Sequence, residues 1–292
     1  MFHGSMVAIV TPMHLDGSID EASLRRLIDW HIAEGTQAII IIGTTGESPT
    51  LTAKEKVRVI KIAVEQAAGR VPVIAGTGSN STSVAIENAQ NAMAAGADAC
   101  LVITPYCNKP TQEGLYLHFK AIAEAVALPM ILYNVPSRTA CDLLPATIAR
   151  LSSISNIVGV KEATGKLERV GEILAACNNK IDVYSGDDAT ALDLILLGAR
   201  GVISVTANML PKAMYEICAL ALKGEKEKAL QLNQPLMSLH KALFLEANPI
   251  PLKWALHQMG LIPAGIRLPL TPLSEQYHQS LPLAMHEAGI KL

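Results

Sequence analysis

Eight short apolar segments alternate with segments of helical periodicity along the 292-residue chain, and no other feature limits the possible folds as strongly. The segments are apolar at every position, which is typical of strands buried on both faces in a parallel sheet. Eight strand–helix units of about 28 residues each predict a closed (β/α)8 TIM barrel rather than an open sheet. The expected strands are 6–11, 38–42, 72–75, 99–104, 130–133, 156–160, 182–185 and 201–205.

The C-terminal part of the chain lacks this alternation. It shows helical periodicity with breaks at Asn248-Pro-Ile-Pro251 and Arg267-Leu-Pro269, and it contains no strand signal. We therefore expect a catalytic barrel over residues 1–224 and an appended helical subdomain over residues 225–292. The second segment is too short to hold a large core alone.

Composition excludes several classes of protein. The 24 basic and 26 acidic residues give a net charge of −2, so nothing electrostatic favours a nucleic acid or an anionic membrane as partner. Mean hydropathy is +0.30, yet no run of about 18 uncharged apolar residues is present for a membrane helix. The N-terminus does not resemble a signal peptide, and the five cysteines form no C-x-x-C pair. We expect reduced thiols in a cytoplasmic protein.

Glycine and polar residues gather directly after the expected strands, where TIM barrels carry their active sites. Asp187 and Asp188 could suggest a metal, but they stand where a helix cap is expected. The eight histidines form no pair at metal-binding spacing, so we expect no metal. The strand-end segments are Gly43-Thr-Thr-Gly-Glu47, Gly76-Thr-Gly78, Thr104-Pro-Tyr-Cys107, Tyr133-Asn-Val-Pro-Ser-Arg138, Lys161-Glu162 and Ser185-Gly-Asp-Asp188.

Lys161 is the most informative single residue. Because side chains alternate along a strand, Lys161 and Gly159 face the same side, and an inward Gly159 would leave space beneath an inward lysine. Burial in an apolar barrel mouth disfavours the charged ammonium, and a neutral amine can form a Schiff base with a ketone. The alternative is a lysine that reaches the barrel rim or pairs with Glu162.

Three further features fit such a site, each with an ordinary alternative. Tyr133 ends the neighbouring strand, where a phenol can exchange protons with a reacting group, or can simply bind backbone in the core. The Gly43–Gly46 loop offers hydroxyl and backbone N–H donors for a carboxylate, but glycine and threonine are also common turn residues. Arg138 could bind a second carboxylate in bidentate fashion, or lie on the surface.

Taken together, these residues resemble the dihydrodipicolinate synthases (4-hydroxy-tetrahydrodipicolinate synthases) over nearly the whole chain. The Lys161 motif alone marks the wider family of pyruvate-dependent class I aldolases, and Ser137-Arg138 resembles the synthases rather than the sugar-acid lyases. The matching motifs are Gly43-Thr-Thr-Gly-Glu-Ser48, Val73-Ile-Ala-Gly-Thr-Gly78, Tyr133-Asn-Val-Pro-Ser-Arg-Thr139, Gly159-Val-Lys-Glu-Ala163, Ser185-Gly-Asp-Asp188 and Asn248-Pro-Ile-Pro251.

The resemblance implies a lyase of lysine and diaminopimelate biosynthesis that condenses pyruvate with aspartate 4-semialdehyde. Lys161 would form the Schiff base with pyruvate, and Tyr133, helped by Thr44, would pass protons. The imine would serve as electron sink, so no cofactor is expected.

The resemblance also implies which residues bind the substrates and how the chain assembles. Thr45 would hold the pyruvate carboxylate and Arg138 the carboxylate of the semialdehyde, while Gly186 and Ile203 would line the pocket through backbone carbonyls. Members of the family are usually homotetramers built from two tight dimers.

Two departures from the family pattern matter. A second tyrosine usually follows Tyr106 and completes the proton relay across a dimer interface, whereas this chain has Cys107. We expect altered rather than abolished proton transfer. At the effector positions of lysine-inhibited members the chain carries Ala53, Lys56 and Val84, of which Lys56 would repel a cationic amino acid. Lysine feedback is therefore predicted to be weak or absent.

Two alternatives remain open from the sequence. One is a sibling enzyme, such as N-acetylneuraminate lyase or a keto-deoxy sugar acid aldolase. The other is an inactive barrel that binds pyruvate or another keto acid, for which Cys107 is the best argument.

Overall fold

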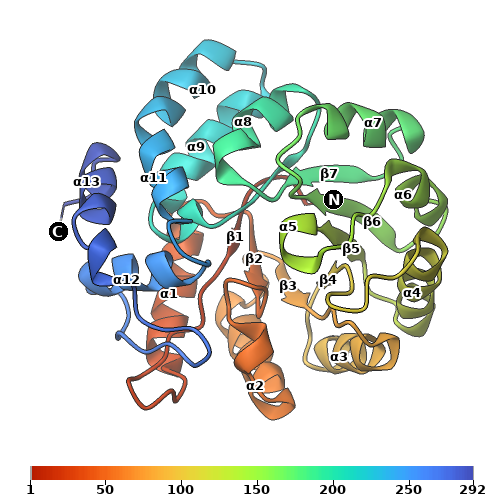
Figure 1. The fold of residues 1–292 in the computed structure, drawn as a ribbon, viewed down its shortest axis with the longest axis horizontal. Coiled ribbons are helices and arrows are strands. Elements are labelled where there is room, and N and C mark those ends of the chain that lie inside the picture. The colour runs from red at the N-terminus through yellow and green to blue at the C-terminus, as the bar shows by residue number, and fades with distance from the viewer. Residues whose placement is uncertain (1, 292) are drawn as a thin grey trace.

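The computed structural model describes residues 2–291 and shows eight parallel strands closed into a barrel, with helices around the outside (Figure 1). Each strand pairs with the next one along the chain, and β8 closes the ring by pairing with β1. This confirms the predicted (β/α)8 barrel. The strands are β1 (Gly4–Ala8), β2 (Ala38–Ile41), β3 (Val73–Gly76), β4 (Ala99–Ile103), β5 (Met130–Asn134), β6 (Ile157–Glu162), β7 (Asp182–Ser185) and β8 (Gly201–Ser204).

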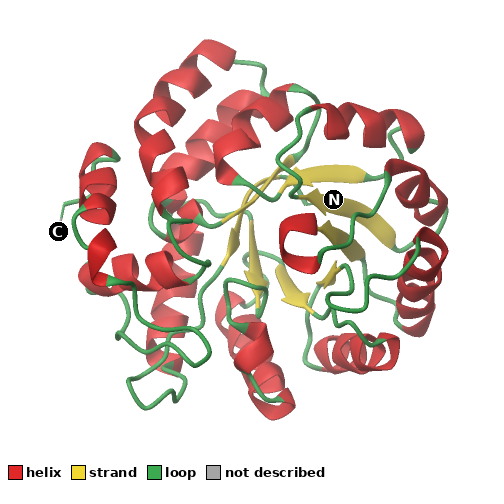
Figure 2. Ribbon diagram, in the orientation of Figure 1, coloured by secondary structure: helices red, strands yellow, loops and turns green. Residues whose placement is uncertain are grey.

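Helices follow the strands in the order that the sequence predicts, and Figure 2 shows them as an outer layer around the sheet. Thr52 and Glu55 form the expected capping box, and Asp20 caps the first helix. The barrel helices are α1 (Glu21–Ala33), α2 (Ala53–Ala67), α3 (Thr82–Ala94), α4 (Gln112–Ala125), α5 (Pro136–Thr139), α6 (Pro145–Leu151), α7 (Glu168–Ala176), α8 (Asp188–Leu196) and α9 (Pro211–Leu222).

Most strand ends differ from the expected ones by one residue, and two differ by more. The first strand ends at Ala8 instead of continuing to Thr11, because the N–H of Val10 donates to the side chain of Asn208. The sixth strand continues to Glu162, so Lys161 lies inside β6 and its side-chain direction is fixed by strand pairing.

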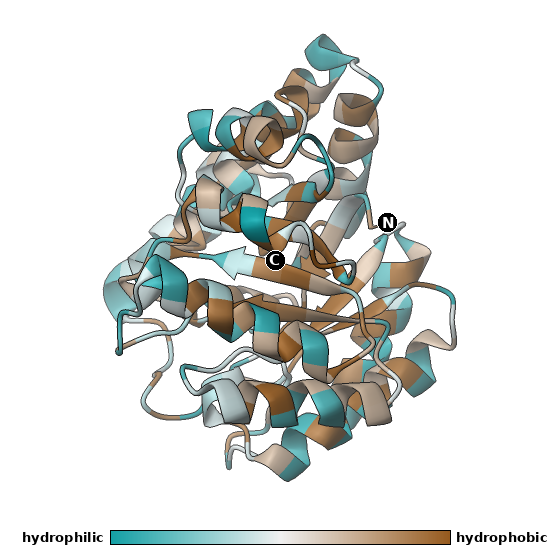
Figure 3. Ribbon diagram, turned by 90° about the vertical axis from the view of Figure 1, so that its right-hand side faces the viewer, coloured by the Kyte–Doolittle hydropathy of each residue, from teal (hydrophilic) through white to brown (hydrophobic). Residues whose placement is uncertain are grey.

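The strands separate two apolar cores. Alternate strand residues, among them Met6, Ile40, Leu101 and Ile131, fill the barrel interior, while the opposite faces pack against the helices. Accordingly, Figure 3 shows strand ribbons that are largely hydrophobic and outer helices that change from hydrophobic to hydrophilic around their axes. The filled interior leaves the polar site only at the C-terminal mouth of the barrel.

The chain after α9 continues as helices on one side of the barrel (Figure 1). α10 packs against α9 and α8, and α11 packs against α8 and α13. None of the helices in residues 2–291 has the length and apolar character needed to span a bilayer. The added helices are α10 (Lys226–Asn233), α11 (Met237–Ala242), α12 (Ile250–Gln258) and α13 (Ser280–Glu287).

Candidate active site

Lys161 lies in the barrel mouth with its side chain directed inward, as the alternation along the strand predicts. Strand register places it opposite Tyr133 of β5 and Tyr184 of β7. Its Nζ is 4.2 Å from the centroid of the Tyr133 ring, and only 6% of the residue is exposed. The alternative pairing with Glu162 is wrong, because that carboxylate points the other way and accepts hydrogen bonds from Asn134 and Thr164.

Two glycines make room around this lysine. A Cβ on Gly159 would lie 2.7 Å from Cε2 of Tyr184, so the space beneath Lys161 is occupied by the Tyr184 ring. A Cβ on Gly186 would lie 3.0 Å from Cε of Lys161 and 2.7 Å from Cβ of Ala163. The lysine chain therefore lies against backbone that only glycine allows to approach so closely.

The surroundings of Lys161 favour its neutral form. Burial lowers the pKa of the amine from 10.5 to about 7, with Arg138 acting in the same direction and Asp188 against it. No carboxylate in residues 2–291 forms an ion pair with Lys161. A large fraction of the amine is consequently free to act as a nucleophile near neutral pH.

Tyr133 places a phenol beside that amine. Burial raises the pKa of its phenol to about 12, while Arg138 and a hydrogen bond with Thr44 act in the opposite direction. The phenol therefore stays protonated at neutral pH. A protonated phenol with a second hydroxyl in the same cavity can pass protons to and from a reacting group.

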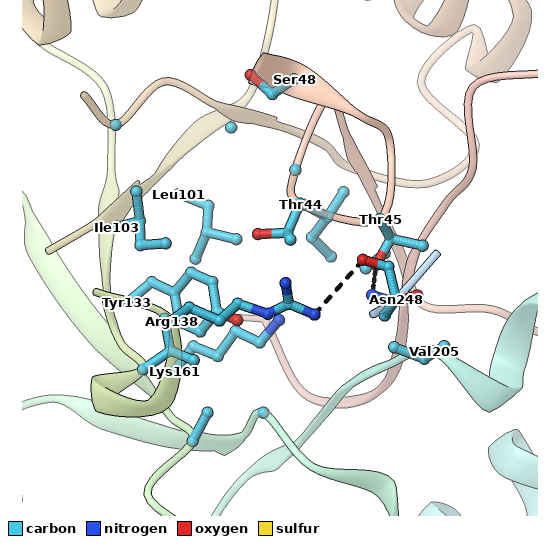
Figure 4. Close-up of a pocket in the computed structure, with 18 of the residues that line it drawn as sticks. Thr44, Thr45, Ser48, Leu101, Ile103, Tyr133, Arg138, Lys161, Val205 and Asn248 are labelled. Atoms are coloured by element: carbon cyan, nitrogen blue, oxygen red, sulfur yellow. Dashed lines mark hydrogen bonds between the residues drawn. The ribbon is translucent and has the colours of Figure 1, made fainter. Parts of the chain in front are cut away.

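Thr45 and Arg138 are both held by Asn248, a residue for which the sequence suggested no role. The Asn248 side-chain amide donates to Oγ1 of Thr45 at 2.9 Å, and the Asn248 carbonyl accepts from Nη2 of Arg138 at 3.4 Å. Figure 4 shows Arg138 extending from the side of Tyr133 toward Asn248 across the mouth of the pocket. One residue thus connects the two groups expected to hold substrate carboxylates.

A buried ion pair fixes the loop that carries Thr44 and Thr45. Glu47 adopts the left-handed conformation with φ of 57°, which is unfavourable for a residue other than glycine unless its surroundings impose it. Its carboxylate binds Nζ of Lys253 on α12 and also accepts from the N–H of Arg267 at 3.2 Å. The C-terminal helices therefore take part in shaping the barrel mouth.

The mouth opens into a cavity of about 980 Å³, a size typical of small-molecule sites. Six of the residues singled out in the sequence line it: Thr44, Thr45, Tyr133, Arg138, Lys161 and Gly186. Ser137, Val205 and His240 line it as well. The cavity therefore collects residues from the ends of several strands and from the C-terminal helices.

Two predicted residues lie elsewhere. The side chain of Ile203 is fully buried in the barrel interior, and Val205 two positions later lines the cavity. Cys107 is exposed on the loop after β4, with φ of 71°, whereas its neighbour Tyr106 lines the cavity. Within residues 2–291, no group of three or more His, Cys, Asp or Glu side chains is placed to hold a metal ion.

Comparison with known proteins identifies close relatives over the full length. The sequence matches the Dihydrodipicolinate synthetase family over residues 1–288. The 4-hydroxy-tetrahydrodipicolinate synthase of Nitrosococcus oceani is 62% identical over 290 residues, covering 99% of each chain. The synthase of the same name from Pseudomonas aeruginosa is 58% identical over 290 residues, with 99% of each chain covered.

Solved structures give the same result. The chloride-inhibited dihydrodipicolinate synthase of Acinetobacter baumannii, complexed with pyruvate, superposes with a TM-score of 0.98 at 57% identity over 100% of both chains. The dihydrodipicolinate synthase of Aquifex aeolicus gives a TM-score of 0.96 at 44% identity, covering 99% of this chain and 98% of that one. The predicted family and enzyme class are confirmed: the chain belongs to the dihydrodipicolinate synthetase family.

Proposed function

We propose that this chain is a 4-hydroxy-tetrahydrodipicolinate synthase of lysine and diaminopimelate biosynthesis, which condenses pyruvate with aspartate 4-semialdehyde through a Schiff base on Lys161. The observation that carries the proposal is a buried lysine without an ion-pair partner among the described residues, set over the ring of Tyr133 in the barrel mouth. A relative of 62% identity bears the name of this synthase, and a solved relative was complexed with pyruvate.

The first half of the reaction uses Lys161, Tyr133 and Thr44. The neutral amine of Lys161 attacks the carbonyl carbon of pyruvate, and a proton passes from the nitrogen to the former carbonyl oxygen to give a carbinolamine. Its hydroxyl then takes up a proton and leaves as water, which produces a cationic iminium. The Tyr133 phenol and the Thr44 hydroxyl would move these protons, since both line the cavity that holds the amine.

The second half forms the new carbon–carbon bond. Loss of a methyl proton from the iminium gives an enamine, whose carbon attacks the aldehyde. The amine of the semialdehyde then displaces Lys161 as the product cyclises. The iminium is itself the electron sink, so these steps need neither a metal nor an organic cofactor.

Carboxylate binding orients both substrates. Thr45 and the backbone of the Gly43–Gly46 loop would hold pyruvate, and Arg138 at the exposed rim would hold the semialdehyde. Gly186 and Ile203 would contribute backbone carbonyls. Hydrogen bonds from Asn248 to Thr45 and from Arg138 to Asn248 support this division, because they set the spacing between the two carboxylate sites.

The proposal also covers organisation and location. We assign residues 1–224 to the catalytic barrel and residues 225–292 to the helical subdomain. We expect the protein to be a cytoplasmic homotetramer. We expect neither a nucleic acid nor a membrane as a partner. The five free cysteines support a reducing compartment.

Borohydride trapping with pyruvate tests the covalent step. The native chain should gain a reduced pyruvate adduct on the peptide containing Lys161, and a Lys161→Arg variant should gain none. An adduct on another lysine, or none on the native chain, would overturn the assignment and favour an inactive keto-acid-binding barrel. Turnover of pyruvate with aspartate 4-semialdehyde, measured beside lyase assays with sialic acid and keto-deoxy sugar acids, separates the synthase from its sibling enzymes.

A further inference from the structure

Asp188 carries a buried carboxylate that has no role in the proposed reaction. It is the first residue of α8 and is 2% exposed. The neighbouring Asp187 caps that helix by accepting from the N–H of Ala189 at 3.1 Å. Asp188 instead accepts from the N–H groups of Val205 and Thr206, both at 2.9 Å, just beyond the end of β8. These two N–H donors stabilise the carboxylate, which burial has removed from water.

The second oxygen of this carboxylate has no visible partner. Oδ1 of Asp188 is buried and forms no hydrogen bond within the part of the chain that the structure describes. No lysine or arginine among residues 2–291 lies within ion-pair distance of it. A buried carboxylate without a counter-ion is costly even when one of its oxygens accepts two hydrogen bonds.

The charged and titratable groups that face Asp188 come from four elements. His240 of α11 bonds Thr206 and Asn233, and burial keeps its pKa low enough for the ring to be neutral at pH 7. Burial raises the pKa of the Cys218 thiol on α9 to about 12. Asp187 carries the same sign of charge as Asp188. Lys161 is the remaining group, and it is the one that becomes cationic.

Backbone contacts connect Asp188 with the part of the cavity wall beside Lys161. Gly186, two residues before Asp188, lies against Cε of Lys161, and its N–H donates to the carbonyl of Glu162 at 2.8 Å. Val205, whose N–H binds Asp188, lines the same cavity as Lys161. Asp188 itself is not among the residues that line the cavity, so its carboxylate lies behind the wall that Gly186 and Val205 form.

We propose that Asp188 is a positioning residue whose negative charge stabilises the cationic iminium formed on Lys161. This inference rests on the proposed function. When the carbinolamine hydroxyl leaves as water, a positive charge develops on the Lys161 nitrogen; it disappears again when the methyl proton is lost and the enamine forms. A fixed negative charge outside the substrate pocket lowers the barrier to dehydration without reacting itself.

An Asp188→Asn variant tests this with two separate measurements. Competitive acetylation across a pH series, with the Lys161 peptide quantified by mass spectrometry, reports the pKa of the free amine without any substrate. Loss of the opposite charge should lower that pKa by about one unit. In single-turnover borohydride trapping, the variant should form the iminium about tenfold more slowly at saturating pyruvate.

The chain offers a control in Asp187→Asn, which removes a charge one residue away, on a side chain that caps the helix and forms no bond to Val205 or Thr206. This variant should leave the Lys161 pKa within a few tenths of a unit. Asp188→Glu, which keeps the charge, should restore most of the pKa and the trapping rate. If the asparagine variant does not fold, Asp188→Ser removes the same charge and keeps an acceptor for the two N–H groups.

The outcomes separate this inference from the proposed function. A native chain that pyruvate and borohydride do not label refutes the Schiff-base assignment itself. A native chain that is labelled, together with a charge-free variant of unchanged Lys161 pKa and unchanged trapping rate, refutes only the role of Asp188. Equal effects of the Asp187 and Asp188 variants would also refute it, since a general change at this helix terminus would then explain the result.

Discussion

Replacing Lys161 by methionine should make the protein more stable. The lysine is 6% exposed and has no ion-pair partner in residues 2–291, so folding places an amine where its charged form is disfavoured. Methionine has a similar length, is flexible enough to fit the same space and adds apolar contacts beside Tyr184. We therefore expect the loss of activity to be accompanied by a gain in the free energy of unfolding.

The size of that gain follows from the pKa. Burial lowers the pKa of Lys161 from 10.5 to about 7. At about 1.36 kcal/mol per unit, the cost of the charged amine approaches 5 kcal/mol well below pH 7 and is about 4 kcal/mol at pH 7, where half of the native amine is neutral. Relaxation around a charged group reduces such values, so we expect a gain of about 2–4 kcal/mol at pH 7.

The pH dependence has a definite sign. The folded-state pKa lies below the unfolded one, so between pH 7 and 10.5 the unfolded chain binds more protons, and native stability rises with pH through this window. The advantage of the methionine variant should therefore shrink by about 1 kcal/mol per pH unit above pH 7.5, and should be constant below about pH 6.

Urea unfolding of both proteins at pH 6, 7 and 9.5 measures this difference, with equal protein concentrations so that assembly contributes equally. The matched control is Lys253→Met. Lys253 is also buried, but it is paired with Glu47, and its removal leaves a buried carboxylate alone. That variant should lose about 3–5 kcal/mol. A Lys161 variant that is less stable than the native chain, or a gain that does not change between pH 7 and 9.5, would refute the reasoning.

Three further predictions concern activity. Asn248→Ala removes one hydrogen bond to Thr45, and the KM for pyruvate should rise roughly two- to tenfold in steady-state kinetics; an unchanged KM would show that Thr45 needs no support. Cys107 is exposed and does not line the cavity, so Cys107→Ala should keep measurable turnover, whereas complete loss of activity would make the thiol indispensable. Lysine should not half-inhibit the enzyme at sub-millimolar concentration in an inhibition titration, because Lys56 lines the cavity in place of an anionic or neutral partner.

The barrel and the inward direction of Lys161 could be predicted because both depend on short sequence periods. Uniformly apolar segments indicate strands buried on both faces, and a period of two assigns Lys161, Gly159 and Tyr133 to one face. The structure adds the reason for Gly159, which is the ring of Tyr184 on the neighbouring strand. That contact depends on the register between β6 and β7, and the sequence of either strand alone does not determine this register.

Contacts between distant segments explain what the sequence did not reveal. Asn248 binds Thr45 across 203 positions, and Lys253 reaches Glu47 across 206. Neither pair has a periodic or motif signal, although Asn248 stands in a segment that resembles the family. Asp188 was interpreted with Asp187 as a helix cap, and only its bonds to the chain after β8 distinguish the two.

Lys161 and Lys253 are two buried lysines with different surroundings, and the proposed function gives a reactive role to the first alone. Both are buried, and burial lowers the pKa of each. At Lys253 the contact with Glu47 opposes the effect of burial, and the Thr11 carbonyl accepts a further hydrogen bond from Nζ at 3.1 Å. These partners stabilise the protonated ammonium, which has no lone pair and cannot act as a nucleophile. At Lys161 the amine lies over the face of the Tyr133 ring, and the Asp188 carboxylate, which opposes the effect of burial, lies behind the cavity wall. In the proposed mechanism, the Asp188 carboxylate is close enough to Lys161 to stabilise the transient iminium cation. It forms no ion pair with Lys161, so it does not hold the resting amine in its protonated form.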